Sequence, residues 1–483
     1  MKVLFVVSEC VPFVKSGGLA DVAGSLPKEI RKLGADIRVI LPKYGTIVDE
    51  YKILMKKTAA FTVKVGWRNQ YCGIEELQYE GITFYFVDNE YYFNRENLYG
   101  YYDDGERFAF FNRAILDCLQ HIDFTPDVIH CHDWHTGMVP FLLRVEYQAK
   151  KGYECIRTVF TIHNLKFQGI MPKQALQDLF GLSNRYFHID QLEFYNHISF
   201  MKGAIVAADK ITTVSPTYEK EIQVEYYGER LHELLKSREE DLQGILNGID
   251  EDLYDPEFDS LLHENYHSEQ RNGKLANKSF IQGKFGLPRK PDTPLVVMIT
   301  RLTEQKGLDL VRYVFHELML EDIQMIIIGT GDAQFEQFFK EMSHVYPDKC
   351  KAFIGFDETL AHQTYAAADL FLMPSKFEPC GLGQMIAMRY GAIPIVRETG
   401  GLKDSVQAFN ELTGNGNGFS FSHYNAHDML FMVQKALRFY RDELCWKTLV
   451  KNAMTADFSW AQSAYQYNQL YDEVISRSES HVF

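Results

Sequence analysis

The stretch Lys15-Ser16-Gly17-Gly18-Leu19-Ala20-Asp21-Val22 determines which fold is expected for the first half of this chain. It follows the Val-rich apolar run 2–7, which predicts a buried parallel strand. Paired glycines let a backbone approach a ligand closely, and a lysine at a helix start suits a phosphate. A plain strand-to-helix turn has the same pattern, and the spacing is neither a Walker loop nor a dinucleotide fingerprint. The stretch alone therefore predicts only a strand, a turn and a helix.

The composition is that of a globular chain with two to four domains, since it has 483 residues of which 46% are hydrophobic and 24% charged. A formal net charge of −15 argues against nucleic acid or an anionic membrane surface as a partner. None of the eight cysteines forms a CxxC pair, so we expect free thiols and a cytoplasmic location. No apolar run approaches membrane-spanning length. The sequence leaves the oligomeric state open, a homo-oligomer included.

Short apolar runs alternate with helical patterns through the first half, which predicts a parallel sheet wrapped by helices. The expected strands are 2–8, 37–41, 83–87, 127–131, 157–162 and 210–214, and the expected helices are 20–33, 106–121 and 136–150. Residues 58–86 predict an inserted hairpin, and 216–243 predict an exposed helical excursion.

The same pattern begins again after residue 250, where we expect a domain boundary. A short strand is expected within 244–250, and the polar, Pro-containing stretch 251–293 follows it. Further strands are expected at 295–300, 325–328, 352–355, 370–374 and 393–396, with helices at about 268–284, 307–320 and 460–476. The predicted domains are residues 1–250, residues 251–457 and a C-terminal helical segment, 458–483.

An internal echo links the two halves. The sequence Gly17-Gly18-Leu19 recurs as Gly400-Gly401-Leu402, again between a strand and a helix. Two doubly wound domains, each with a glycine loop, would present ligand sites beyond the carboxyl ends of their strands. We therefore expect two Rossmann-like α/β domains that face a deep cleft.

Two loops of the second half carry groups suited to a sugar phosphate. Arg301 and Lys306 follow a strand and suit a diphosphate, although each is also typical of a solvated surface. Glu378, in a Pro-flanked loop before Gly381-Leu382-Gly383, could accept hydrogen bonds from sugar hydroxyls or cap a helix. Amides at 382–384 could meet phosphate oxygens.

The first half places His132-Asp133-Trp134-His135 and Thr161-Ile162-His163-Asn164 directly after two strands. These groups suit acid–base chemistry, and no third-ligand pattern supports a metal. His130 lies within its strand and is expected to be a core histidine. The aromatic loops 91–93 and 99–102 suit stacking on a sugar ring or a nucleobase, but loops of this kind are more often packed.

Together these pieces resemble the bacterial glycogen synthases and plant starch synthases, retaining glucosyltransferases of the GT-B fold. The matching stretches run in family order from residue 2 to about residue 476: Lys15–Leu19, His132–His135, Thr161–Asn164, Asn247–Asp250, Arg301–Gly307, Phe377–Leu382 and Thr399–Asp404.

The resemblance implies transfer of glucose from ADP-glucose to the non-reducing end of an α-1,4-glucan, glycogen or a maltooligosaccharide, with no cofactor and no metal. It assigns catalysis to Asp133, His163, Arg301, Lys306 and Glu378. It assigns substrate binding to Lys15, Gly17, Gly18, Tyr99, Asn247, Phe356, Cys380, Gly381, Leu382 and Gly383. In this assignment Arg301 and Lys306 neutralise the leaving diphosphate, Glu378 binds glucose hydroxyls, and Phe356 packs on adenine.

Two departures from the family pattern bear on mechanism. Ile386 stands where many retaining GT-B enzymes carry a second glutamate, and Gly383 replaces a hydroxyl residue. No nucleophile partner for Glu378 is evident, so same-face substitution assisted by the departing phosphate is expected, in contrast to a two-carboxylate hydrolase. The alternatives are a related enzyme that uses UDP-glucose or another acceptor, and a catalytically weak glucan-binding protein.

Overall fold

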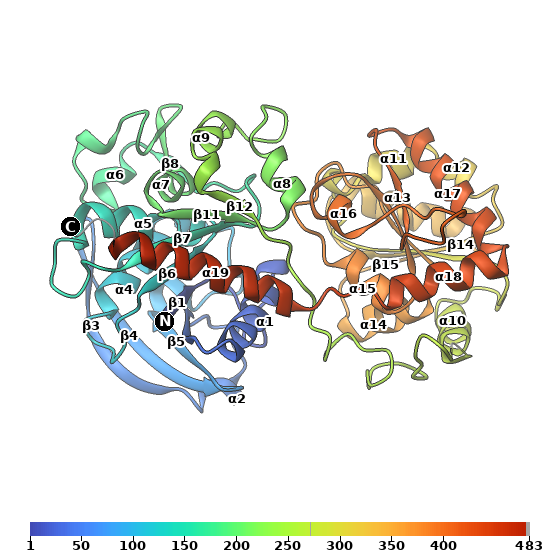
Figure 1. Ribbon diagram of the computed structural model, residues 1–483, viewed down its shortest axis with the longest axis horizontal. Helices are drawn as coiled ribbons and strands as arrows, with labels where there is room; N and C mark the ends of the chain where they lie inside the picture. Colours follow the sequence, from blue (N-terminus) through green and yellow to red (C-terminus); the bar gives the residue numbers. More distant parts are fainter. Residues whose placement is uncertain (271, 480–483) are drawn as a thin grey trace. The chain divides into compact units, whose positions relative to one another are not determined.

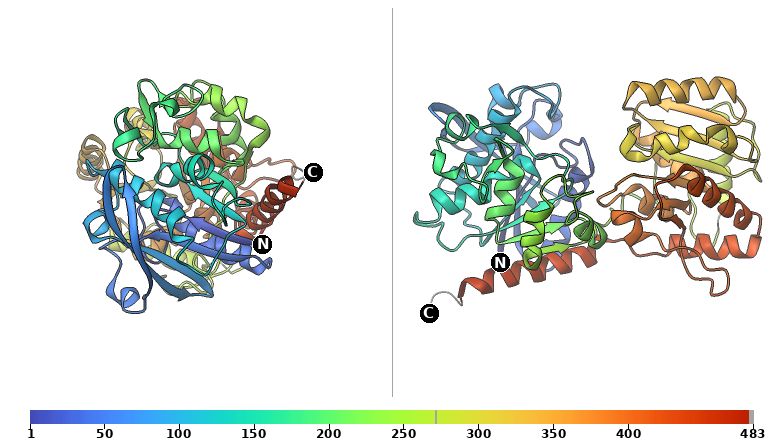
Figure 2. Two further views of the ribbon diagram at one scale, coloured as in Figure 1. Left: turned by 90° about the vertical axis from the view of Figure 1, so that its left-hand side faces the viewer. Right: turned by 90° about the horizontal axis from the view of Figure 1, so that it is seen from above.

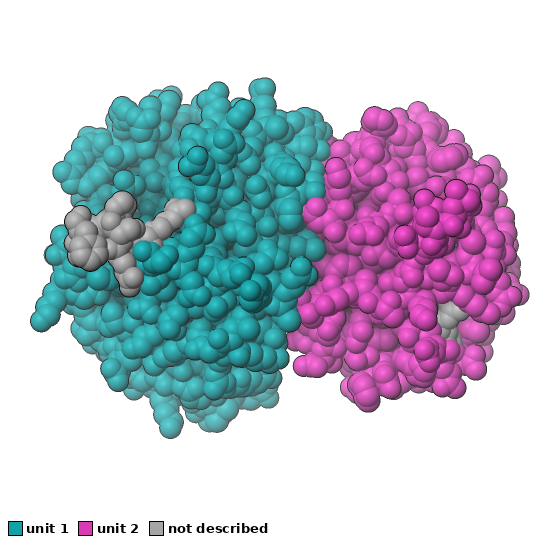
Figure 3. Space-filling model, in the orientation of Figure 1, with its two compact units in different colours: residues 1–248, 460–483 teal, residues 249–459 magenta. Residues whose placement is uncertain are grey.

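The computed structural model describes residues 1–270 and 272–479, and the chain divides into two compact units (Figures 1 and 3). Unit 1 comprises Met1–Gly248 together with the segment that starts at Trp460, and unit 2 comprises Ile249–Ser459. Each is an α/β unit built on its own sheet, as expected for the predicted fold class.

Unit 1 is built on a nine-stranded sheet in the order β12-β11-β7-β6-β1-β2-β5-β4-β3. Its strands are β1 Lys2–Val6, β2 Asp36–Pro42, β3 Lys56–Val65, β4 Arg68–Tyr79, β5 Ile82–Asp88, β6 Val128–His132, β7 Arg157–Ile162, β11 Lys210–Thr213 and β12 Leu242–Gly244. Only the β3–β4 and β4–β5 pairings are antiparallel, which confirms the predicted hairpin insertion. A smaller sheet joins β8 Ile170–Pro172, β10 His197–Ser199 and β9 Glu193–Phe194.

The central strand of unit 1 is β1. It pairs in parallel with β2 on one side and β6 on the other, and its residues Val3 to Val6 are completely buried. A strand covered on both faces needs an unbroken apolar run instead of an alternating one. That requirement explains why the run at the start of the sequence is apolar throughout.

The helices of unit 1 are α1 Gly18–Lys32, α2 Asp49–Lys52, α3 Glu90–Phe93, α4 Asp104–Cys118, α5 Met138–Leu142, α6 Ala175–Asp178, α7 Phe200–Ala207, α8 Pro216–Glu221, α9 His232–Ser237 and α19 Trp460–Glu479. The continuous helix expected at 136–150 is wrong in one respect. After α5 the chain widens into a π-helix, Leu143–Tyr147, a rare geometry that is frequent at functional sites.

The C-terminal helix α19 packs on α1 and lies along unit 1 (Figures 1 and 2). Its buried residues recur every three or four positions and form one face: Trp460, Ala464, Tyr467, Leu470, Tyr471 and Val474. The helix is therefore an integral part of the core of unit 1, although it follows unit 2 in the sequence.

Unit 2 contains a parallel sheet in the order β15-β14-β13-β16-β17-β18. Its strands are β13 Leu295–Ile299, β14 Gln324–Gly329, β15 Cys350–Ile354, β16 Leu370–Met373, β17 Ile393–Arg397 and β18 Phe419–Phe421. Its helices are α10 Asn272–Lys284, α11 Leu308–Tyr313, α12 Phe315–Leu318, α13 Ala333–Val345, α14 Glu358–Ala367, α15 Gly383–Arg389, α16 Gly400–Ser405, α17 Ala426–Tyr440 and α18 Glu443–Met454.

Two expected elements near the start of unit 2 differ from the structure. The strand expected within 244–250 ends at Gly244, because its partner β11 ends opposite it at Thr213. The helix expected at 307–320 is divided at Val314, where the backbone leaves the helical region. Val314 and Phe315 are both completely buried, and the break lets these consecutive side chains enter the core.

Candidate functional site

Each sheet has a switch point, a position from which the connections to the next strands run in opposite directions along the sheet. In unit 1 the chain runs from β1 to β2 on one side, and β6 lies on the other. In unit 2 the equivalent point lies between β13 and β16. Ligands of doubly wound sheets bind at such switch points, beyond the carboxyl ends of the strands. Most of the residues predicted for the site lie in loops that follow strands, whereas Tyr99 lies between α3 and α4.

In unit 1, the glycine loop after β1 is held by Glu9, a residue that the sequence analysis missed. Glu9 is 4% exposed and its Oε2 accepts the backbone amides of Ser16 and Gly17. Burial raises the pKa of Glu9, while the hydrogen bonds from Ser16 and Gly17 oppose that shift. Lys15 extends from the same loop and pairs with Asp21, Nζ to Oδ1 2.6 Å. Gly18 begins α1.

Asp133 lies on the other side of this switch point, directly after β6. Its backbone has φ +55° and ψ 179°, a region that residues other than glycine rarely occupy. Its Oδ1 accepts the amides of His163 at 2.8 Å and Asn164 at 3.3 Å. Burial, with a smaller contribution from Glu9, raises the pKa of Asp133 to about 7. Strain and a shifted pKa in one residue are typical of a functional position.

His163 is held as a neutral imidazole. Burial lowers the pKa of His163 to about 3, and its Nε2 lies 2.9 Å from Nδ1 of His132. That contact leaves Nδ1 of His163 for a ligand. His130 is a core histidine, as predicted: its ring nitrogens contact Tyr471 Oη at 2.7 Å and Thr161 Oγ1 at 2.6 Å.

Two further predicted residues of unit 1 differ in what they offer a ligand. Tyr99 donates to Ser8 Oγ at 2.8 Å, and its ring packs on His135 at 4.4 Å, which favours the packed-loop interpretation of its segment. Asn247 is buried, and its Oδ1 has no hydrogen-bond partner among the described residues. A buried amide oxygen of this kind can accept a ligand hydroxyl.

In unit 2, an ion pair spans the switch point. Lys306 follows β13 and Glu378 follows β16, and their Nζ and Oε2 atoms are 2.6 Å apart. Ser375 donates to the same Oε2 at 3.0 Å. Both charged side chains are largely buried, so each depends on the other for charge compensation.

Arg301 and Phe356 remain exposed at the same edge of this sheet. Arg301 follows β13, and within the described chain its side chain makes no hydrogen bond or ion pair. Phe356 follows β15 and is 70% exposed. The guanidinium is therefore available to an anion, and the ring is available to a planar group.

The glycines of unit 2 shape the Glu378 loop. A Cβ at Gly400, where φ is +44°, would lie 1.9 Å from the carbonyl oxygen of Glu378, and the amide of Gly401 donates to that oxygen at 3.2 Å. The Gly400-Gly401 pair therefore packs against the Glu378 loop of the same unit. Gly383 begins α15, and a Cβ there would lie 3.2 Å from the Phe371 ring, a tight contact.

The other predicted loop residues form the turn into α15. Cys380 is buried, Gly381 has φ +70°, and Leu382 is the N-cap of the helix. Glu9, Ser375 and His132 contact predicted residues, and the sequence assigned none of these contacts, because spacing along the chain does not show which side chains meet. No group of three or more potential metal ligands occurs among the described residues. None of the helices in the described ranges combines the length and apolarity needed to cross a membrane.

Comparison with known proteins covers both units. A family model described as "Starch synthase catalytic domain" matches residues 2–237, and one described as "Glycosyl transferases group 1" matches residues 281–444. The chain is similar to the glycogen synthase of Anoxybacillus flavithermus, at 62% identity over 482 residues and 100% of each chain. It is also 62% identical to the glycogen synthase of Geobacillus thermodenitrificans, over 99% of each chain.

Two solved structures are similar to this one. The catalytic domain of starch synthase IV from Arabidopsis thaliana, bound to ADP and acarbose, matches with a TM-score of 0.92 and 34% identity, over 98% of this chain and 99% of that chain. A sucrose-phosphate synthase from Thermosynechococcus elongatus matches with a TM-score of 0.63 at 16% identity, over 99% of each chain. The second likeness shows the fold alone.

Proposed function

This chain belongs to the glycogen synthase family of retaining glucosyltransferases, and we propose that it transfers glucose from ADP-glucose to the non-reducing 4-hydroxyl of an α-1,4-glucan through the residues described above. Glucan elongation is the reaction of that family. The ADP held by the Arabidopsis starch synthase supports an adenine nucleotide as the donor.

The observation that carries the residue assignment is the ion pair between Lys306 and Glu378 at the unit 2 switch point. A nucleotide-sugar brings a diphosphate for the lysine and hydroxyl groups for the carboxylate. Each buried charge thereby exchanges its partner for a ligand group of suitable chemistry. Arg301 adds a second cation, and the two together stabilise the negative charge that develops on the departing diphosphate. Phe356 offers its exposed ring to the adenine.

The groups of unit 1 suit the sugar. Asp133, His163 and Asn247 offer a carboxylate, a neutral imidazole and an unpartnered amide oxygen. We assign them to the glucose hydroxyls and to the positive charge that builds on the anomeric carbon. We assign Lys15 and the Gly17-Gly18 backbone to the diphosphate and glucose of the donor.

The reaction proceeds by same-face substitution. The C–O bond to the diphosphate breaks as the acceptor's 4-hydroxyl approaches on the same side, and the departing phosphate oxygen takes the acceptor's proton. One carboxylate oxygen of Asp133 already accepts two backbone amides. We therefore assign Asp133 a hydrogen-bonding role and not that of a nucleophile. A trapped covalent glucosyl-Asp133 or glucosyl-Glu378 would contradict this course. We place the reaction in the cytoplasm, with glycogen or a maltooligosaccharide as acceptor.

The test is a transfer assay with radiolabelled ADP-glucose and UDP-glucose in parallel, using glycogen as acceptor. We expect incorporation from ADP-glucose to dominate, and Glu378→Ala to abolish it while the protein still binds glycogen. Preferential use of UDP-glucose would contradict the donor assignment. Unchanged transfer in Glu378→Ala would contradict the site.

A further inference from the structure

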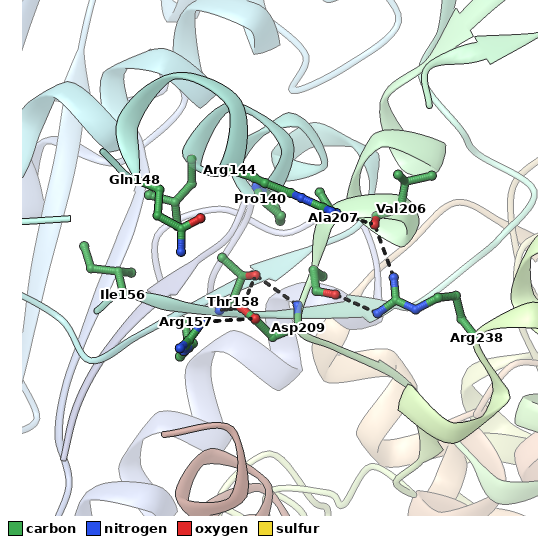
Figure 4. A pocket seen from close by; sticks show the side chains of 12 residues that line it. Pro140, Arg144, Gln148, Ile156, Arg157, Thr158, Val206, Ala207, Asp209 and Arg238 are labelled. Carbon is green, nitrogen blue, oxygen red and sulfur yellow. Dashed lines mark hydrogen bonds and ion pairs between the residues drawn. The ribbon is translucent and has the colours of Figure 1, made fainter. Parts of the chain in front are cut away.

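A second candidate site lies in unit 1, at the opposite end of the sheet from Asp133 and His163. It is an open cavity of about 480 Å³ (Figure 4). Arg157 and Thr158, the first residues of β7, line it, as does Asp209, which directly precedes β11. His163 follows the other end of β7, so the length of a six-residue strand, roughly 20 Å, separates the cavity from the sugar-binding groups.

The cavity has an excess of positive charge in a chain whose net charge is −15. Arg144, Arg157 and Arg238 line it, against one carboxylate, Asp209. One oxygen of that carboxylate is already engaged, because Oδ2 accepts the amide and the hydroxyl of Thr158 at 2.7 and 2.9 Å. The contact of Oδ1 with Arg157 is long, 3.7 Å. The local cations are therefore only partly neutralised.

Two of the arginines converge on one neutral acceptor. Arg144 and Arg238 each donate to the carbonyl oxygen of Val206 at 3.3 Å (Figure 4). Arg238 also has a structural role. It donates to the carbonyls of Ile205 and Ala208 at the end of α7 and pairs with Asp241 at 3.1 Å. Two like charges held at one carbonyl, without a carboxylate between them, favour an anion.

Arg144 has most of its hydrogen-bonding capacity unused. Within the described chain its bond to Val206 is the only one it makes, and no carboxylate lies within 4.0 Å of it. It stands on the π-helix Leu143–Tyr147. Nε of Arg157 is buried without a hydrogen-bond partner among the described residues. Gln148, beside Arg144 in Figure 4, turns its amide toward the strand that carries Thr158.

The rest of the lining narrows the class of ligand. It contains no aromatic side chain, so the cavity lacks a surface for stacking on a glucan ring. The lining offers donors at Arg144, Gln148 and Arg157, and Oδ1 of Asp209, which among the described residues has only the long contact with Arg157, remains as an acceptor. The volume is within the range of small-molecule sites. We propose that this cavity binds a small polyhydroxylated phosphomonoester, with the phosphate at Arg144 and the hydroxyl groups toward Arg157 and Asp209.

The test is isothermal titration calorimetry of the full-length protein with ribose 5-phosphate, inorganic phosphate and ribose at fixed ionic strength. We expect saturable binding of ribose 5-phosphate, at least tenfold tighter than inorganic phosphate, and none of ribose. Arg144→Gln and Arg157→Gln should each weaken it at least tenfold. Arg144 makes a single long hydrogen bond, so its variant is expected to fold, which a thermal melt checks.

Two control variants separate this site from the donor groups and from general charge effects. Arg31→Gln changes an exposed arginine of α1, and Lys306→Ala removes the buried lysine of unit 2. Binding should be unchanged in both. Absence of saturable binding, or equal loss in Arg31→Gln, would overturn the proposal. Loss in Lys306→Ala with retention in Arg144→Gln would assign the binding to the donor residues instead. Equal affinity for inorganic phosphate would overturn the polyhydroxylated class.

Discussion

The switch points of the two units hold different kinds of chemistry on similar sheets. In unit 2 the groups are charged: Lys306 and Glu378 compensate each other, and Arg301 faces solvent. In unit 1 burial shifts the pKa of His163 to about 3 and that of Asp133 to about 7, so that hydrogen bonding predominates. We expect this difference if unit 2 binds mainly the phosphates and unit 1 mainly the sugar, because phosphates are bound by cations and sugar hydroxyls by hydrogen-bonding groups. The predictions below test that division.

The largest expected effect is that of Lys306→Ala. It removes a cation assigned to the diphosphate and leaves the Glu378 carboxylate buried without its ion-pair partner. We expect kcat/KM for ADP-glucose to fall about 10³-fold, near the upper range for loss of one transition-state contact. Steady-state transfer into glycogen measures it, with Lys340→Ala on α13 as the exposed-lysine control. An effect under tenfold would contradict the role of unit 2.

The second prediction concerns pH and unit 1. The pKa of Asp133 is raised, so its carboxylate is lost as the pH falls through about 7. If the ionised form stabilises the positively charged sugar, kcat/KM should decline on that acid limb. Asp133→Asn should abolish the limb and lower the plateau about 10²-fold. An unchanged acid limb in the variant would show that another group titrates there.

The third prediction tests how the Glu378 loop is supported. Gly400→Ala places a Cβ against the carbonyl oxygen of Glu378, whereas Gly414→Ala introduces the same positive-φ strain with only Thr448 nearby, at 3.6 Å. We expect Gly400→Ala to reduce activity at least tenfold and to destabilise unit 2 by about 2–3 kcal/mol. Gly414→Ala should cost about 1 kcal/mol and leave activity unchanged. Urea unfolding and transfer assays distinguish them, and equal losses in both would contradict a specific role for Gly400.

The smallest expected effect is that of Lys15→Ala, the counterpart of Lys306 in unit 1. Lys15 is 38% exposed and pairs with Asp21, which is also partly solvated, so its removal leaves no buried charge. We expect roughly a tenfold rise in KM for the donor with little change in unfolding free energy. A loss as large as that of Lys306→Ala would remove the distinction between the two lysines.

The sequence predicted the fold class and most strands, because central parallel strands require unbroken apolar runs, such as 2–7 and 325–328. It also predicted loops at the carboxyl ends of strands, and Asp133, Lys306 and Glu378 lie in such loops. The sequence could not show which other residues hold these loops in place. Nothing in the sequence distinguishes Glu9 from the other acidic residues, whereas in the structure its carboxylate accepts the amides of Ser16 and Gly17.

Backbone geometry and cavities were also beyond the sequence. Nothing in the sequence of Leu143–Tyr147 distinguishes a π-helix from the α-helix that precedes it. Neither could spacing reveal that Arg144, Arg157 and Arg238, up to 94 positions apart in the chain, line one cavity. Such sites depend on tertiary packing of segments with no shared motif.

The insertion of unit 2 between Gly248 and Trp460 has a consequence for synthesis. The bond between Tyr471 and His130 joins positions 341 residues apart, and contacts of such separation form late. On a ribosome, unit 2 emerges whole before α19 does, which at 5–20 residues per second takes roughly 10–40 s. During that interval the side of α1 that α19 will cover stays exposed. The nascent chain therefore carries an unfinished apolar surface that a chaperone could recognise, until α19, made after unit 2, completes unit 1.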